Sequence, residues 1–291
     1  MHLFLKVACV VVLALVIVIL HQKIRSSSTM FHVTENNDGL KEELKQVMDA
    51  TQRNRILINK IHCAAKEVLP SGGFCIDKNN VLIGGNYLWS AKLCAGLEDI
   101  FSWSTVGDLG AGLGHYGQCF LRLAKPLVIS ANKSELKSMN DTFYKKMSES
   151  RLLGTPQVIK SWQGWDGASN IDELSAGNIG VVDLMIPVDL GRKFDWIMSL
   201  EVGEHIPKAG EKIFIDNLVK HACVGVVLSW AVPGQGGHSH VNCRTNDYVK
   251  DQMAKRGLES DQETEYKLRG PVELDYFKNT LMVFRFVKRK C

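Results

Sequence analysis

The sequence predicts an α/β fold in which a mostly parallel sheet lies between helices. Three apolar runs suggest its strands. The run from Ile100 to Val106 leads into a glycine-rich turn and then a helix-like segment. The run from Lys193 to Leu200 leads into an acidic turn, and the run from Gly225 to Trp230 is continuously apolar, as expected for a strand buried on both faces.

Length and composition allow one domain of roughly 200–250 residues with appendages. The chain has 291 residues, of which 45% are hydrophobic and 23% charged, with a net charge of +4. This mild charge gives no reason to expect a nucleic-acid partner. We predict an N-terminal segment over residues 1–25, a polar stem and helix over 26–65, and a catalytic domain over 66–291 with an insertion at about 125–157.

The N-terminus holds an unbroken apolar run from Val7 to Leu20. We expect an uncleaved signal anchor that inserts in the membrane; a cleaved signal peptide and a cytosolic protein are the alternatives. The high cysteine count and glycosylation sequons at Asn132 and Asn140 favour a luminal domain in the ER or Golgi, with secretion as second choice.

Beyond this run, an apolar stripe with helical spacing extends from Leu40 to Ile61. We expect one stem helix that packs on the domain rather than a coiled coil, since the stripe is short and contains Thr51 and Asn54.

The turn after the first strand fits two ligand-binding patterns. Gly112-x-Gly114-x-x-Gly117 matches a dinucleotide fingerprint, whereas Asp108-x-Gly110-x-Gly112-x-Gly114 matches a second pattern. Both rely on glycine because a Cβ atom would block the approach of a ligand to the backbone.

The turn after Leu200 reads Glu201-Val-Gly-Glu-His-Ile-Pro207. Together with the turn that begins at Asp108, this segment resembles class I S-adenosylmethionine (SAM)-dependent methyltransferases over about residues 84–286. The resemblance implies a Rossmann-like sheet of about seven strands, a final antiparallel strand at Thr280 to Val287, and SAM as cofactor.

The resemblance also implies a set of cofactor contacts. An acid that ends the second strand would hold the ribose hydroxyls. The run from Pro126 to Ser130 ends without an acid, so we place that strand at Val158 to Trp165, closed by Asp166. The full expected set is Asp108, Gly110, Ala111, Gly112, Gly114, Asp166, Asp183 (for the adenine amino group), Leu200 and Glu201.

Catalytic candidates lie in two loops. Glu204 and His205 follow the fourth strand, and the loop from Ala231 to Asn242 contains two histidines, of which we select His238. Such a pair could orient a substrate, accept a proton or bind a metal. Carboxylates beside an imidazole also suit a divalent ion, but no second cluster is evident, and we expect no metal.

The amphipathic segment from Tyr87 to Leu97 is expected to be a helix that covers the sheet; the alternative is an aromatic wall for the cofactor, formed by Tyr87 or Trp89. We therefore expect a membrane-anchored methyltransferase with an unidentified acceptor, which could be a small molecule, a glycan or a protein. The alternatives are a catalytically inactive SAM-binding scaffold and an NAD(P)-dependent oxidoreductase.

Overall fold

A seven-stranded sheet forms the centre of the protein in the computed structural model, which describes residues 38–63, 72–73, 75–76, 89–128 and 133–291. The strand order is β3-β2-β1-β4-β5-β7-β6. The strands are β1 (Thr105–Leu109), β2 (Ser161–Asp166), β3 (Ile179–Val181), β4 (Phe194–Leu200), β5 (Ala222–Ser229), β6 (Leu258–Ser260) and β7 (Met282–Phe286). The first five are parallel, and β7 is antiparallel to both β5 and β6.

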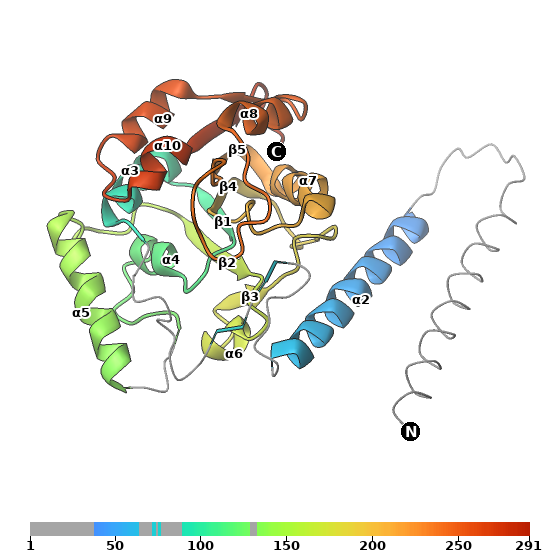
Figure 1. Cartoon of the computed structure of the whole chain (residues 1–291), viewed down its shortest axis with the longest axis horizontal. Coiled ribbons are helices and arrows are strands. Elements are labelled where there is room, and N and C mark those ends of the chain that lie inside the picture. Colours follow the sequence, from blue (N-terminus) through green and yellow to red (C-terminus); the bar gives the residue numbers. More distant parts are fainter. Residues whose placement is uncertain (1–37, 64–71, 74, 77–88, 129–132) are drawn as a thin grey trace, which may run out of the picture. The chain divides into compact units, whose positions relative to one another are not determined.

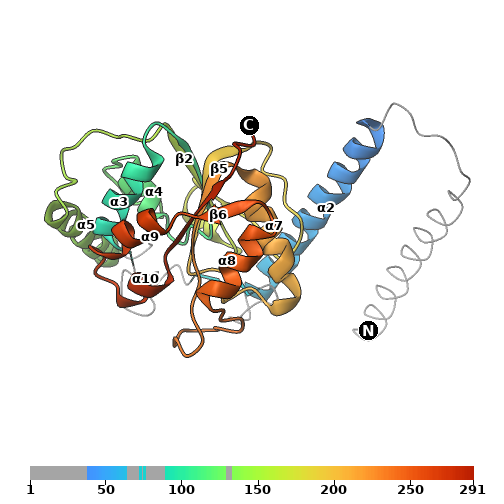
Figure 2. The same cartoon turned by 90° about the horizontal axis from the view of Figure 1, so that it is seen from above.

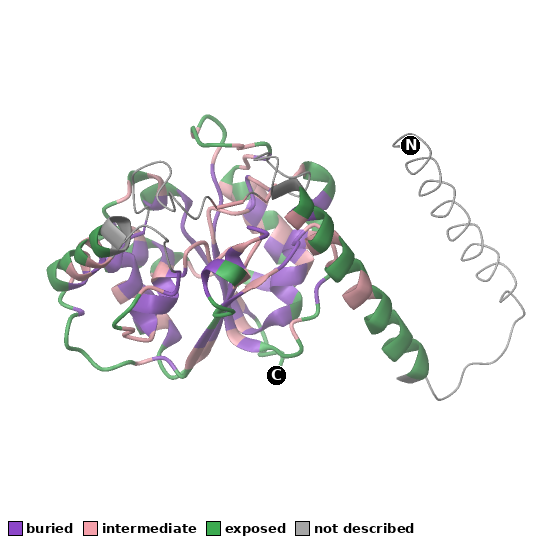
Figure 3. Ribbon diagram, turned by 90° about the horizontal axis from the view of Figure 1, so that it is seen from below, coloured by how far each residue is buried: buried purple, intermediate pink, exposed green. Residues whose placement is uncertain are grey.

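Helices cover both faces of this sheet (Figures 1 and 2). The described helices are α2 (Asp38–Cys63), α3 (Ala91–Phe101), α4 (His115–Phe120), α5 (Lys133–Glu149), α6 (Ile171–Leu174), the short 3-10 helix η1 (Lys208–Gly210), α7 (Glu211–His221), α8 (Asn246–Ala254), α9 (Gln262–Arg269) and α10 (Asp275–Thr280). One buried core joins α3, α4, α9 and α10 to the sheet, and a second joins α7 and α8 to its other face. Figure 3 shows the buried residues along these inner surfaces.

The predicted α/β class and the seven-stranded, mostly parallel sheet are confirmed. Asp166 ends β2, which pairs with β1, so the choice of the second strand is also confirmed. The rejected run at 126–130 has no strand in its described part, and its last two residues lie outside the described residues. Of the two sequons, Asn140 is half-buried within α5, and Asn132 lies outside the described residues.

The second half of α2 packs on the domain through polar side chains. Gln52 hydrogen-bonds to the backbone of Asp183, and Arg55 pairs with the carboxylate of Asp183. The predicted apolar stripe does not make this contact, since Val47 and Ile61 are 62% and 68% exposed. The helix was predicted correctly, but the face that it turns to the domain was not.

The expected anchor at residues 1–25 lies outside the described residues, and among the helices that are described none has the length and apolar character needed to cross a membrane. Disulfides between described residues join Cys94 to Cys119 and Cys223 to Cys291, and Cys75 is also disulfide-bonded. Cys243 is a free thiol.

Candidate active site

The glycine turn between β1 and α4 has a left-handed backbone at three positions. Gly110, Gly112 and Gly114 have φ values of 94°, 54° and 77°, which side chains with a Cβ atom rarely adopt. A Cβ atom on Gly110 would collide with Val202, whereas one on Gly112 would meet no atom within 4 Å. The backbone at Gly112 is therefore open to the approach of a ligand.

Asp166 holds this turn in place. One oxygen of its carboxylate accepts the Gly112 N–H at 2.7 Å, and the other accepts the Ala168 N–H at 2.8 Å. The N–H groups of Gly110 and Ala111 both donate to the carbonyl of Trp165, at 2.8 and 2.9 Å. Burial raises the pKa of Asp166, and its backbone hydrogen bonds oppose this shift. The end of β2 thus sets the shape of the turn; a ribose contact by Asp166 stays a prediction.

Asp108 lies beneath the turn and is 2% exposed. Its carboxyl accepts the indole N–H of Trp162 at 3.2 Å, and burial raises its pKa to about 8. The same indole ring packs against Gly117, where a Cβ atom would lie 2.6 Å from it. Gly117 thus allows α4 to pack closely on β2. In this position Asp108 supports the turn from the inside, and direct contact with a cofactor stays a prediction.

Asp183 has other partners in the structure than the predicted adenine. Its side chain is 1% exposed and pairs with Arg55, while its second oxygen accepts the Met185 N–H at 2.9 Å. Both oxygens are thus engaged by α2 and by the chain that follows β3. The adenine contact remains untested, and the observed role is to attach α2.

The turn after β4 begins with a strained residue. Leu200 is half-buried at the strand end, and Glu201 has a φ of 54°, an uncommon value for a residue other than glycine. The Glu201 N–H donates to the Ser229 hydroxyl at 2.8 Å. Its carboxylate accepts hydrogen bonds from Gln235 at 2.6 Å and from Thr280 at 3.2 Å. These contacts fix Glu201 between β5, α10 and the loop that follows β5.

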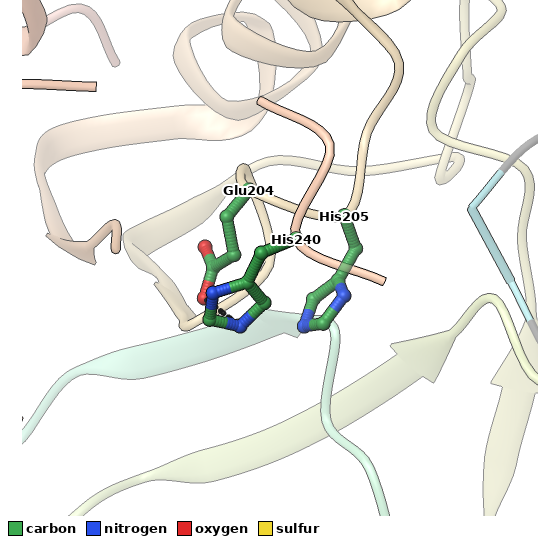
Figure 4. Close-up of side chains that lie close together, drawn as sticks. All are labelled: Glu204, His205 and His240. Carbon is green, nitrogen blue, oxygen red and sulfur yellow. Dashed lines mark ion pairs between the residues drawn. The ribbon is translucent and has the colours of Figure 1, made fainter. Parts of the chain in front are cut away.

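Glu204, His205 and His240 lie together at this edge of the sheet (Figure 4). One ligating atom of each lies within 4.8 Å of those of the other two. Nε2 of His240 is 3.9 Å from the Glu204 carboxylate, and the two imidazole rings are 5.0 Å apart between centroids. His238, which the sequence suggested, is exposed on the loop. A catalytic role for His238 is untested, but the geometry favours His240.

Backbone hydrogen bonds hold the two loops that carry this cluster. The N–H groups of Val241 and Asn242 both donate to the Glu204 carbonyl at 2.9 Å. The indole of Trp230 donates to the Asn242 carbonyl at 2.7 Å, and Arg244 pairs with Glu211 at 2.6 Å. His240 is thereby fixed beside residues that lie far from it in the sequence.

The cluster has unusual electrostatics. Burial and the neighbouring Glu201 carboxylate raise the pKa of Glu204 to about 8, which nearby backbone N–H groups only partly oppose. Burial and His240 lower the pKa of His205. Burial and the carboxylates of Glu201 and Glu204 raise the pKa of Tyr276. These shifts favour the neutral forms of the Glu204 carboxyl, the His205 imidazole and the Tyr276 phenol.

Sequence reasoning missed His240, Gln235 and Tyr276. The two histidines of the loop are separated by one residue, and no pattern indicates which of them points inward. Trp89 is 2% exposed and stacks on Phe143 with ring centroids 4.9 Å apart, so it belongs to the core; Tyr87 lies outside the described residues. A cavity of about 690 Å³ between α3, α9 and residues 150–158 includes none of the predicted site residues.

No family model and no curated protein matches this chain. Among solved structures, the chain is similar to a SAM-bound amino pentose methyltransferase from Micromonospora echinaspora involved in calicheamicin biosynthesis (13% identity, 71% of this chain, 95% of that chain, TM-score 0.43). It is also similar to magnesium protoporphyrin IX methyltransferase from Synechocystis PCC 6803 with bound SAH (13% identity, 67% of this chain, 82% of that chain, TM-score 0.41). A third similar structure is that of the [4+2]-cyclase SpnF (9% identity, 67% of this chain, 79% of that chain, TM-score 0.41). Similarity at this level does not show that this chain shares the activity of these proteins, because one fold can host many functions.

Proposed function

We propose that this protein is a SAM-dependent methyltransferase that binds its cofactor at the turn between β1 and α4. The observation that carries the proposal is the left-handed turn at Gly110, Gly112 and Gly114, open at Gly112 and held by the acid that ends β2. In α/β sheets, ligands bind at the carboxyl ends of the strands, where these residues lie.

The sheet topology supports this cofactor over a nicotinamide. A dinucleotide-binding sheet has the order 3-2-1-4-5-6. Here β7 is antiparallel and lies between β5 and β6, which is the final strand that the sequence resemblance implied. The glycine pattern alone fits both SAM and a nicotinamide dinucleotide, so the strand order is the observation that favours SAM.

The reaction needs an acceptor with a lone pair in line with the sulfonium methyl group. The carbon–sulfur bond breaks and leaves its electron pair on sulfur, while the acceptor lone pair forms the new bond to carbon. A hydroxyl or amine acceptor also releases a proton, which passes to a base or to water. Glu204 and His205 follow β4, which pairs with β1, and His240 follows β5, the next strand in the sheet; there the three side chains could orient such an acceptor.

Calorimetric titration of SAM into wild-type protein and Gly112→Ala tests the cofactor site. We expect at least tenfold weaker binding by the variant, because the new methyl group occupies the open approach and the turn is strained. Gly191→Ala is the matched control: Gly191 has a φ of 71° and equally open surroundings, but precedes β4. Equal affinity of wild type and Gly112→Ala would place the cofactor elsewhere.

Two outcomes would favour the other functions. Tight binding of NADH without binding of SAM would indicate an oxidoreductase. Tight SAM binding with no conversion of SAM to S-adenosylhomocysteine, even when extracts that contain candidate acceptors are added, would indicate an inactive SAM-binding scaffold.

We also propose that residues 1–25 anchor the enzyme in the membrane with its domain in the ER or Golgi lumen; a secreted protein is the second choice. The disulfides at Cys94–Cys119 and Cys223–Cys291 support an oxidising compartment. Sensitivity of the expressed protein to endoglycosidase would support this topology, whereas protease access from the cytosol would contradict it.

A further inference from the structure

The Glu204 carboxylate is fully buried within the cluster. The residue is 0% exposed, and neither of its oxygens has a partner of normal geometry among the described residues. Buried polar groups are nearly always paired, and an isolated buried carboxylate is costly unless it binds a proton or a cation. This side chain therefore points to something that the protein atoms do not supply.

Two imidazoles lie beside this carboxylate. Nδ1 of His240 lies 3.1 Å from the Gln235 carbonyl, which fixes that nitrogen as the donor and leaves the Nε2 lone pair free. Nε2 is the nitrogen that lies 3.9 Å from Glu204. The backbone of Ser239 acts on the His205 ring as well, since it opposes the lowering of the His205 pKa. Imidazoles oriented in this way by backbone carbonyls are typical of metal ligands.

The three groups are close to the geometry of a loaded site. Ligands at about 2.0–2.2 Å from a tetrahedral ion lie about 3.4 Å apart. Here the three atoms lie within 4.8 Å of one another. The hydrogen bonds from the Val241 and Asn242 N–H groups to the Glu204 carbonyl hold the two loops together, so we expect rotation of the side chains to bring the three atoms closer.

Glu201 and Gln235 surround this set. The Glu201 carboxylate, which lies beside Glu204, is held by Gln235 and Thr280. Gln235 thus contacts Glu201 through its side chain and His240 through its carbonyl. The Cys243 thiol lies 4.0 Å from Nδ1 of His240, on the side of the ring away from Glu204.

We propose that Glu204, His205 and His240 bind one divalent first-row transition metal ion. Two imidazoles and one carboxylate suit Zn²⁺, Fe²⁺ or Mn²⁺. Three protein ligands leave a coordination position open for another molecule. Resting on the proposed function, we further infer that an acceptor hydroxyl takes this position, where the ion lowers its pKa and so prepares it for methylation.

Metal content of the purified full chain tests the site directly. After EDTA treatment and dialysis against Zn²⁺ or Mn²⁺, elemental analysis should find about one ion per wild-type chain. Glu204→Gln and His240→Gln should each bind at least about a hundredfold more weakly, because even loss of an outer partner of a metal ligand costs about 10–100-fold. His238→Gln, on the same loop but exposed, should retain the ion.

Spectra of the Co²⁺-loaded protein provide a readout that needs no cofactor. Wild type and His238→Gln should give visible ligand-field bands that Glu204→Gln lacks. Absence of metal in wild-type protein, or equal binding by Glu204→Gln and His240→Gln, would overturn the inference.

SAM calorimetry on the same samples separates this inference from the proposed function. We expect Glu204→Gln to bind SAM within about twofold of wild type, which would also show that it is folded; if it does not fold, His240→Gln serves instead. Metal binding without SAM binding would refute the proposed function and the acceptor role but leave the metal site. SAM binding without metal would refute the metal site alone.

Discussion

Replacement of Asp166 by asparagine tests how the end of β2 supports the cofactor site. The carboxylate accepts one N–H from Gly112 and one from Ala168. An asparagine amide can accept only one of them, and its NH₂ group would face the other N–H. The variant therefore loses one charged hydrogen bond and places two donors against each other, with almost no change in side-chain volume.

The expected magnitudes follow from these contacts. Loss of a hydrogen bond to a charged group costs about 1.5–3 kcal/mol. A domain of this size loses roughly 2–4 °C in Tm per kcal/mol, so the Tm should fall by about 3–12 °C. If the same carboxylate also holds the ribose hydroxyls, the affinity for SAM falls by about 1–3 kcal/mol, which is about 5–150-fold in Kd.

Thermal unfolding and SAM calorimetry on the same preparation measure both effects. Asp189→Asn is the control, since Asp189 accepts the Gly191 N–H at 2.9 Å in a turn far from β2 in the sequence; it should lower the Tm without changing the Kd for SAM. An unchanged Kd for Asp166→Asn would refute the ribose contact. An unchanged Tm would refute the claim that this acid holds the turn.

Three further predictions concern stability. The pKa of Glu204 is about 8 in the folded protein, against an ordinary value of 4.5. Between these two pH values and without metal (in EDTA), the folded protein keeps a proton that the unfolded chain has lost. The free energy of unfolding therefore falls as the pH rises from 4.5 to 8, by up to about 5 kcal/mol. Chemical denaturation at about pH 6 and about pH 8 measures this fall in the free energy of unfolding, which should be smaller for Glu204→Gln than for wild type. Part of the fall should remain in the variant because the pKa of Asp108 is also about 8. An equal fall in both proteins would contradict the prediction. Cys291→Ser should cost about 4 kcal/mol in the chain-entropy model, given the separation of 68 residues from Cys223, and dithiothreitol should lower the Tm of this variant less than that of wild type. Arg55→Ala should lower the free energy of unfolding by about 3 kcal/mol because it removes the cation beside the buried Asp183 carboxylate. The control Lys60→Ala breaks a half-exposed pair with Asp172 and should lower it by only about 0–1 kcal/mol. Similar decreases of Tm in the two variants would show that the Arg55 pair does not hold α2.

The central strands could be predicted because each is a short apolar run that ends in a chemically distinctive residue. Asp166 and Glu201 mark two such ends, and the glycines after β1 mark a third. β6 was missed because a strand of three residues, Leu258–Ser260, at the edge of the sheet has no detectable period.

The remaining errors concern long-range contacts. The apolar stripe on α2 indicated a helix but not its orientation, because the contacts that hold it are polar and reach residues such as Asp183, far along the chain. The sequence could not indicate, for a similar reason, that His240 rather than His238 lies beside Glu204. Which of the two points inward depends on the hydrogen bonds between the loop and the Glu204 carbonyl, and these exist only in the folded protein.

The double hydrogen bond at the Glu204 carbonyl also bears on how the acceptor range of such an enzyme could diverge. Val241 and Asn242 anchor the far end of the loop, whereas Pro233, Gly234 and residues 236–238 are exposed. Under the proposed function, changes at this exposed tip would alter the surface offered to new acceptors while the anchored end keeps His240 in place. Directed evolution could therefore begin with libraries at the tip, leaving the three clustered side chains untouched.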